Sequence, residues 1–381
     1  MTAREILRGF GSSLKLGEAV QEEEDELRRS FPLEIESTQK AADLYRSGQK
    51  LWIASDLERI EYELAHYKDM TSFTIRRIDG SMVSIKNPMY GVTNPIWWPW
   101  IVFQDYWYLT MKGYKETQLR DELPHSFPYY PYFITWANQA YEQFVDDDPP
   151  LDTEFEEVKQ EWERSPECDW LKRKLATVIG GRKITKVMCF ALGSLDHSRV
   201  HEKKKQLIQH MFALTVATAA RAATGGDVEL FAQEPWYTQP AKDVLKKAGF
   251  SIIGEHGAGG LAKIDDHSIV FSCCPAFPIR QIIADLARPA IIIGTWHESI
   301  FTDKKYVAPI LVSYTCRDYP HPFDTVSPRT REMFKEYTSH DIEVVDPEER
   351  DLRELKDMKI HVRNDVTRGA CMNEGIKESA E

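Results

Sequence analysis

Short apolar runs alternate with amphipathic helical patterns over residues 186–294 of this chain. The apolar runs cover residues 186–192, 228–233, 251–254, 268–273 and 290–294. The helical patterns between them cover residues 202–223, 240–248 and 279–286. Such alternation is typical of a parallel sheet with right-handed crossover helices. We therefore predict an α/β fold, with a Rossmann-like, mainly parallel sheet flanked by helices.

The first 150 residues follow a different pattern. Apolar residues recur at helical spacing from Glu34 to Tyr67, and two strand-like runs flank Asp79-Gly80, a strong hairpin signal. We predict three parts for the whole chain. They are an aromatic-rich α+β N-terminal region that packs on the sheet (1–150), an α/β core (151–315), and a C-terminal helix with a polar tail (316–381).

Trp, Tyr and Phe are concentrated between residues 97 and 144, where prolines break the chain into short pieces. Two interpretations fit this aromatic block: a packed interface with the sheet, or the wall of an apolar ligand pocket. We expect part of residues 97–136 to pack over the carboxyl edge of the sheet and to close a site there. Trp100 and Tyr132 are our candidates for substrate contacts within the block.

Polar residues follow several of the predicted strands. His197 follows the first strand, Glu234 ends the second, and His297 follows the fifth. Ligands of open α/β sheets bind outside the carboxyl ends of the strands, although each residue alone is equally explained as a structural loop residue. We predict that these three residues are catalytic. Further substrate contacts are predicted at Gly193, Ser194, Cys274, Thr295 and Trp296.

Dinucleotide cofactors need a glycine-rich turn that lets the backbone approach the phosphates. Gly193 stands alone after the first strand, and the run 257–260 after the third lacks the full spacing. An S-adenosylmethionine site fits somewhat better, because Glu234 ends the second strand and would hold the ribose hydroxyls, but the glycine turn is again incomplete. His197 and His201 are four residues apart, a spacing that suits capping as well as metal binding. We predict no cofactor and no metal.

Composition narrows the choice of partners. The chain has 381 residues, 42% of them hydrophobic, and a net charge of −12, which argues against a general nucleic-acid binder. We interpret Lys203-Lys204-Lys205 as the solvated face of a helix. No window approaches the roughly 20 apolar residues that span a bilayer, and the N-terminus has no signal-peptide pattern. With six cysteines and no CxxC pair, a reduced, cytoplasmic protein is expected.

Five short segments occur in a distinctive order: 190–194 (Phe-Ala-Leu-Gly-Ser), 233–235 (Gln-Glu-Pro), 244–250, 271–275 and 291–295. Together they resemble the SRR1-like domain, named after the plant "sensitivity to red light reduced" protein, over about residues 170–300. Residues 1–165 resemble only fungal-type relatives. The family often has Tyr-Asp-Pro at 233–235 and a histidine at Cys274, so its acidic residue corresponds to Glu234. The resemblance implies an α/β fold and links to light and clock signalling, cytoskeletal phenotypes and haem metabolism, without an established reaction.

Two classes of function remain from the sequence. Our main hypothesis is a cofactor-independent enzyme of specialised metabolism, which cyclises or isomerises an apolar terpenoid or polyketide-like substrate by confinement and hydrogen-bond polarisation. The alternative is an SRR1-type regulatory protein that binds partners or a metabolite without turnover. A methyltransferase-like protein is a second alternative. A dry cavity beneath the aromatic block favours the enzyme, and a filled interface with an exposed apolar patch favours the regulator.

Overall fold

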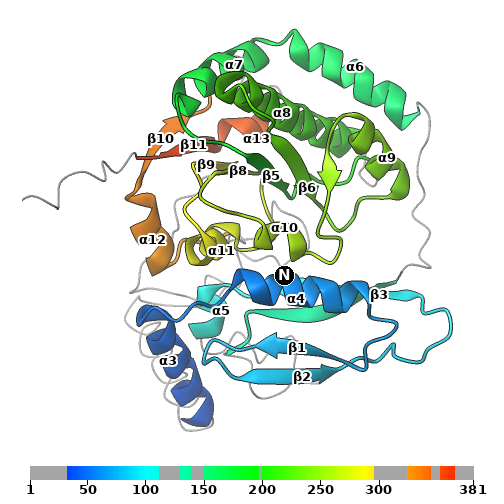
Figure 1. The fold of residues 1–381 in the computed structure, drawn as a ribbon, viewed down its shortest axis with the longest axis vertical. Helices are drawn as coiled ribbons and strands as arrows, with labels where there is room; N and C mark the ends of the chain where they lie inside the picture. Colours follow the sequence, from blue (N-terminus) through cyan, green and yellow to red (C-terminus); the bar gives the residue numbers. More distant parts are fainter. Residues whose placement is uncertain are drawn as a thin grey trace, which may run out of the picture.

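A seven-stranded sheet forms the centre of the fold (Figure 1). The computed structural model describes residues 32–110, 129–138, 150–196, 200–295, 324–344 and 352–364. The strands are β5 (Lys186–Phe190), β6 (Glu229–Gln233), β7 (Ser251–Ile252), β8 (Ser268–Ser272), β9 (Ile291–Thr295), β10 (Tyr337–Asp341) and β11 (Met358–Arg363). They lie in the order β10-β11-β9-β8-β5-β6-β7.

The five strands β5 to β9 are parallel, which confirms the predicted α/β fold with a mainly parallel sheet. Central β5 pairs with β6 on one side and with β8 on the other. The predicted strand positions agree with the observed ones to within about two residues at each end.

Strands β10 and β11 extend this sheet in antiparallel pairing, where the sequence analysis predicts a helix and a polar tail. The helix exists as α12 (Pro328–Phe334). The strand signal of β10 is hidden because its residues, Tyr-Thr-Ser-His-Asp, are largely polar and exposed at the sheet edge. The boundaries at residues 150 and 315 stay predictions, although the sheet itself extends to Arg363.

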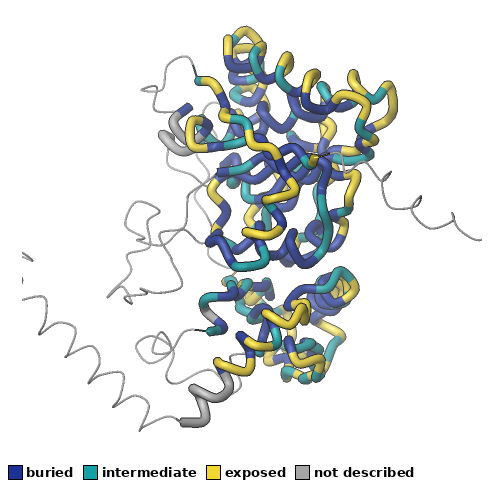
Figure 2. The backbone as a smooth tube through the Cα atoms, turned by 90° about the vertical axis from the view of Figure 1, so that its left-hand side faces the viewer, coloured by how far each residue is buried: buried dark blue, intermediate teal, exposed yellow. Residues whose placement is uncertain are grey.

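Alternating side chains of the central strands enter two different cores. Val187 and Cys189 of β5 pack against α6 (Leu151–Glu163), α7 (Pro166–Ile179), α8 (Val200–Thr224) and α9 (Gln239–Lys247). Met188 and Phe190 point to the other face, which α10 (Gly259–Ala262), α11 (Ile279–Leu286) and α12 cover. A short helix α13 (Arg353–Lys356) precedes β11. Figure 2 shows buried backbone at the centre and exposed turns on the outer helices.

The N-terminal region packs beneath α10 and α11 (Figure 1). It contains α3 (Pro32–Arg46), α4 (Ala54–Ala65), the hairpin of β1 (Ser72–Arg76) and β2 (Met82–Lys86), β3 (Trp97–Phe103), α5 (Tyr106–Thr110) and β4 (Tyr132–Asn138). The predicted Asp79-Gly80 hairpin is confirmed, with Gly80 at φ +84°. The helical pattern of 34–67 forms the two helices α3 and α4, and the chain turns between them at Gly48, with φ +101°.

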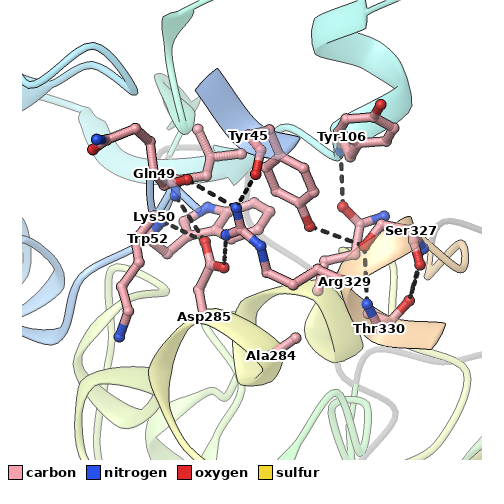
Figure 3. A network of polar contacts seen from close by, with 12 residues as sticks. Tyr45, Gln49, Lys50, Trp52, Tyr106, Ala284, Asp285, Ser327, Arg329 and Thr330 are labelled. Atoms are coloured by element: carbon pink, nitrogen blue, oxygen red, sulfur yellow. Dashed lines mark hydrogen bonds and ion pairs between the residues drawn. The ribbon is translucent and has the colours of Figure 1, made fainter. Parts of the chain in front are cut away.

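A buried ion pair joins three separate segments at this interface (Figure 3). The Asp285 carboxylate on α11 accepts hydrogen bonds from the backbone N–H groups of Leu51 and Trp52, at 2.7 and 3.2 Å, and pairs with Arg329 of α12. Arg329 in turn donates to the backbone carbonyl of Tyr45 and lies over its ring, 3.8 Å from the centroid. Parts of the chain far apart in sequence therefore share one polar junction.

Candidate functional site

We call the residues that end or follow the parallel strands at their carboxyl ends the strand rim: Gly193, Ser194, Glu234, Cys274 and Thr295. Gly193 and Ser194 lie in the loop after β5, Glu234 directly follows β6, and Thr295 is the last residue of β9. Gly193 has φ +76°, a conformation that favours glycine.

Glu234 is the half-buried carboxylate of the rim. It accepts backbone hydrogen bonds from Gly193 and from Trp236, the latter at 3.3 Å. Burial raises the pKa of Glu234 to about 7. The two hydrogen bonds have the opposite effect on this pKa, but burial is the larger cause. Near neutral pH this carboxyl is therefore poised between its protonated and ionised forms.

A buried Tyr-His pair lies close to Glu234. Tyr237 donates its hydroxyl to Nε2 of His210 at 2.7 Å, because the His210 Nδ1–H is held by the Gln206 carbonyl at 2.7 Å. Burial lowers the pKa of His210 to about 4, so the ring is neutral. Burial, and then the charge of Glu234, raise the pKa of Tyr237. The sequence analysis missed this pair, since nothing in the local pattern brings residue 210 to residue 237.

The loop after β5 is tied to the start of α9 by Asp196. Its carboxylate accepts hydrogen bonds from Ser194 Oγ at 2.9 Å and from the Thr238 hydroxyl. Thr238 is also the N-cap of α9, with its side chain accepting from the Ala241 N–H. Ser194, a predicted substrate contact, is buried and bonded to the protein's own carboxylate.

At the other end of the rim, Cys274 and Thr295 lie side by side. The Cys274 N–H donates to Thr295 Oγ1 at 2.9 Å, and its sulfur is 3.4 Å from the same oxygen. Cys274 is exposed and has φ +46°. A small cavity of about 20 Å³ lies beside Thr295, between β8, β9 and α11. Since a water needs roughly 10–15 Å³, this cavity has room for one or two waters and not for an organic substrate.

The aromatic strand β3 runs along the loops that follow β6, β7 and β8. Trp100 meets Trp236 edge to face, with centroids 5.4 Å apart. Ile101 donates its N–H to the carbonyl of His256 at 3.0 Å. Trp98 stacks on the His256 ring at 5.0 Å. Trp100 therefore lies at the rim, as the sequence analysis expects.

Tyr132 occupies a different place. It is buried in the core of the N-terminal region, edge to face with Phe103. Burial raises its pKa, and the charged groups that affect it are those of α4 and β1, among them Arg59, Asp56 and Arg76. The structure thus separates Tyr132 from the groups around Glu234.

The glycine run after β7 is filled by the protein itself. The Glu61 carboxylate of α4 accepts the N–H groups of His256, Ala258 and Gly259, at 2.9 to 3.0 Å. On the inner side, Gln233 bonds the Gly260 N–H at 2.6 Å. In nucleotide-binding folds such N–H groups hold a phosphate, so here a side chain occupies that position.

His197, Trp296 and His297, which we predict at the rim, lie outside the described residues, and their roles stay predictions. Among the described residues, no three His, Cys, Asp or Glu side chains are grouped so that they could hold a metal. The predicted solvated lysines of α8 are paired with α6: Lys203 with Glu154, and Lys204 with Glu161 at 3.0 Å. None of the described helices is long and apolar enough to cross a membrane.

The family model of the SRR1 domain matches residues 171–364, just over half of the chain, and contains the whole strand rim. The chain belongs to the SRR1 domain family, as the resemblance of its strand ends implies. The match extends well past the predicted limit near residue 300 and ends one residue after β11. Comparisons with curated proteins and with solved structures found no match.

The hypothesis of a cyclase or isomerase of specialised metabolism is wrong. The family model finds an SRR1 domain over the rim, which points to the regulatory alternative rather than to such an enzyme. Among the described residues of the aromatic block, Ile101, Tyr106, Tyr130 and Tyr132 are buried in the core that also contains α10 and α11. A wider hollow of about 650 Å³ is open to solvent beside the hairpin, lined by Thr71, Lys86, Asn87, Pro88 and Tyr90.

Proposed function

We propose that this chain is an SRR1-type regulatory protein that binds a metabolite at its strand rim without converting it. The observation that carries the proposal is the SRR1 domain match over residues 171–364, which includes every described rim residue. The family implies signalling roles and no established reaction. The rim is where an open α/β sheet offers its ligand site.

The strand order supports a Rossmann-like arrangement of the core. Along the sheet, the parallel strands follow the order β7-β6-β5-β8-β9, which is 3-2-1-4-5 when they are numbered along the chain. That is the order of the Rossmann-like folds, whose ligands lie where the order reverses, beside the first strand. In this chain the reversal lies between β5 and β8, flanked by the Gly193 loop and by Cys274.

The chemistry of the described rim supports binding rather than turnover. Ser194 bonds Asp196, and the Cys274 thiol lies against the Thr295 hydroxyl, so both side chains are engaged within the protein. The exposed apolar side chains are a surface for contacts instead. Six of the eight large exposed apolar side chains of the described residues lie on β3, in the loop before it and in the β6 turn: Tyr90, Val92, Ile96, Trp97, Val102 and Trp236.

A second candidate function is a methyltransferase-like use of S-adenosylmethionine. Two observations favour it. Glu234 ends the second parallel strand, and β11 is inserted antiparallel between β9 and β10, an arrangement common among Rossmann-like methyltransferases. The loop after β5 contains Gly193 without further glycines, which weakens the resemblance to their cofactor loop.

The test is native mass spectrometry of the full chain purified from its own host, followed by incubation of the bound species. We expect a small molecule to co-purify, to be lost in the Glu234→Gln variant, and to be recovered unchanged after hours with excess protein. Conversion of the molecule to a product would contradict a purely regulatory role. Transfer of a methyl group from S-adenosylmethionine would establish the second candidate.

A further inference from the structure

We propose that the strand rim binds a nucleoside, with the ribose diol on the Glu234 carboxylate and the base against the Trp236 indole. This inference rests on the proposed function and names the class of metabolite. Such a site requires a carboxylate with unused acceptor positions, an accessible aromatic side chain beside it, and no group of backbone N–H donors that could bind a phosphate. The structure supports each of these requirements.

Glu234 has acceptor capacity left for a diol. A carboxylate offers about four lone-pair sites. The N–H groups of Gly193 and Trp236 use two of them and hold the group in place. Two neighbouring hydroxyl groups on a ribose ring are a matched pair of donors for the remaining two. In Rossmann-like folds an acidic residue at the end of the second strand makes this contact.

Three buried carboxylates are paired with an arginine, whereas no arginine or lysine of the described residues pairs with Glu234. Asp285 pairs with Arg329, Asp324 with Arg280, and Asp56 with Arg76. The groups that shift the pKa of Glu234 are its own burial and two backbone N–H donors, with no cationic side chain among them. The carboxylate therefore presents a partly desolvated negative charge that hydroxyl donors would stabilise.

The indole of Trp236 lies two residues beyond Glu234 and is 40% exposed. Its backbone N–H is fixed on the Glu234 carboxylate, and its ring is braced by the edge-to-face contact with Trp100. An indole with this much exposed surface is suited to stack on a base, a contact that contributes about 1–3 kcal/mol per base in nucleic-acid complexes. Diol and base would thus be held by two residues of one turn.

The same structure disfavours phosphates. Gly193 stands alone after the first strand, without the further glycines that let a backbone approach a phosphate. The N–H groups of the glycine run after β7 are bonded to Glu61. Glu234 itself would repel an anion close by. The site therefore suits a nucleoside or a nucleoside thioether, and not a nucleotide.

Binding should depend on pH through Glu234. The ionised carboxylate accepts both hydroxyls, whereas the protonated form loses part of that capacity. Because the pKa of Glu234 is raised to about 7, affinity should increase from pH 6 to pH 8. Among the described residues, the buried groups around Glu234 whose pKa values are shifted do not titrate in this range. The pKa of His210 is lowered to about 4, and those of Tyr237 and Cys189 are raised by burial.

The experiment is calorimetric titration of the full chain with adenosine, guanosine, cytidine, uridine and S-adenosylhomocysteine, each next to its 2′-deoxy form where one exists. We expect at least one ribonucleoside to bind with a Kd below about 1 mM. Its 2′-deoxy form should bind at least about tenfold more weakly, since a hydrogen bond to a charged acceptor is lost. NAD should bind no more tightly than the nucleoside.

Variants assign the site. Glu234→Gln keeps the shape and neutral form of the side chain and should weaken binding about tenfold and remove its pH dependence, with little change in Tm. The matched control is Glu229→Gln at the exposed amino end of β6. Trp236→Ala should also weaken binding, whereas Trp97→Ala, an equally exposed indole on β3, should not.

The outcomes separate this inference from the proposed function. Equal affinity for ribo- and deoxynucleosides, or no nucleoside binding at all, overturns the nucleoside site. If a different metabolite then co-purifies and is lost in Glu234→Gln, the regulatory proposal stands without it. If a nucleoside binds as described but is converted by the protein, the nucleoside site stands and the regulatory proposal fails.

Discussion

At the residue scale, His210 shows how burial controls the charge of a single side chain. The ring is fully buried on α8, and its two nitrogens are bonded to the Gln206 carbonyl and the Tyr237 hydroxyl. Burial lowers its pKa from 6.5 to about 4. Protonation would reverse the hydrogen bond with Tyr237, because both ring nitrogens would then be donors and the phenol oxygen would have to accept.

We expect acid to destabilise the protein through His210. A base whose folded pKa is depressed contributes stability above its unfolded pKa of 6.5, and this is lost as the pH falls toward 4. Between pH 7 and pH 5 this one group should cost about 2 kcal/mol of unfolding free energy. Urea unfolding at both pH values tests this, with His210→Gln as the comparison.

The quantity to compare is the change with pH, since the variant is also less stable at pH 7. His361, whose pKa is lowered to about 3, and Glu234, whose pKa is raised, contribute equally to both proteins and cancel. An identical loss from pH 7 to pH 5 in wild type and variant would show that His210 is not the group responsible.

At the element scale, the loop between β7 and α10 depends on a side chain from the N-terminal region. Glu61 of α4 accepts three backbone N–H groups of this loop, from His256, Ala258 and Gly259. Gly259 has no room for a side chain, because an added Cβ would lie 2.9 Å from Glu61. The loop thus has the glycines of an anion-binding turn with an internal carboxylate in place of the anion.

Removing the Glu61 carboxylate should show how much it contributes to the unfolding free energy. We expect Glu61→Ala to lower the unfolding free energy by about 2 kcal/mol, because partly buried N–H groups lose their acceptor. The control is Glu58→Ala, an exposed acidic residue of the same helix, which should change the stability by less than about 0.5 kcal/mol. Equal effects of the two substitutions in thermal or urea unfolding would show that the loop does not need Glu61.

The same loop predicts which cofactors are excluded. NAD, NADP and FAD carry pyrophosphates that need free backbone N–H groups at a glycine turn. Those after β7 are bonded to Glu61, and Gly193 after β5 is bonded to Glu234. We expect no binding in calorimetric titrations at tens of micromolar. A low-micromolar dissociation constant for any of the three would contradict this view of both loops.

At the scale of the whole molecule, the polar junction around Asp285 joins the N-terminal region to the SRR1 domain (Figure 3). Asp285 is buried, and burial raises its pKa despite the opposing charge of Arg329. Gln281, on the same helix, accepts the Tyr106 N–H at 2.8 Å. Without residues 45–110, Asp285 and Gln281 would lose these partners, and the apolar side chains of α11 around them would be exposed to solvent.

We expect Arg329→Ala to lower the stability of both parts together. Removing one partner of a buried ion pair costs about 3 kcal/mol or more, because the other charge is left uncompensated. Unfolding should stay a single transition when followed by tryptophan fluorescence, to which six of the ten indoles contribute from residues 1–150, and by far-UV circular dichroism. The control is Lys335→Ala, because Lys335 is an exposed residue at the C-terminal end of α12.

Two separate transitions would contradict the shared junction, as would a soluble, cooperatively folded fragment of residues 150–381. We expect that fragment to aggregate, because it would expose the apolar face of α11 that the N-terminal region covers.

The central sheet was predictable because its signal is local. Buried parallel strands are short apolar runs, and amphipathic helices separate them, so each element is visible in its own residues. The hairpin at Asp79-Gly80 was predictable for the same reason. Glu234 could be placed at the carboxyl edge because position at a strand end follows from the strand itself.

Other features depend on contacts between distant segments, which no local pattern encodes. Strands β10 and β11 form because the edge of β9 is available for pairing, although β10 is polar in sequence. The hydrogen bond from Ala258 to Glu61 joins residues 197 positions apart, and the bond between Tyr237 and His210 joins residues 27 positions apart. Trp100 and Tyr132 belong to one aromatic block, yet packing places the first at the rim and the second inside the N-terminal region.

The sequence by itself therefore determined the fold class, the order of the strands along the chain and the family, since these follow from periodicity and from short segments at strand ends. The tertiary structure decided what fills the loops, which carboxylate lacks a cationic partner, and whether the aromatic block encloses a cavity. Those outcomes depend on which side chains meet across the interface, and burial there sets their charge.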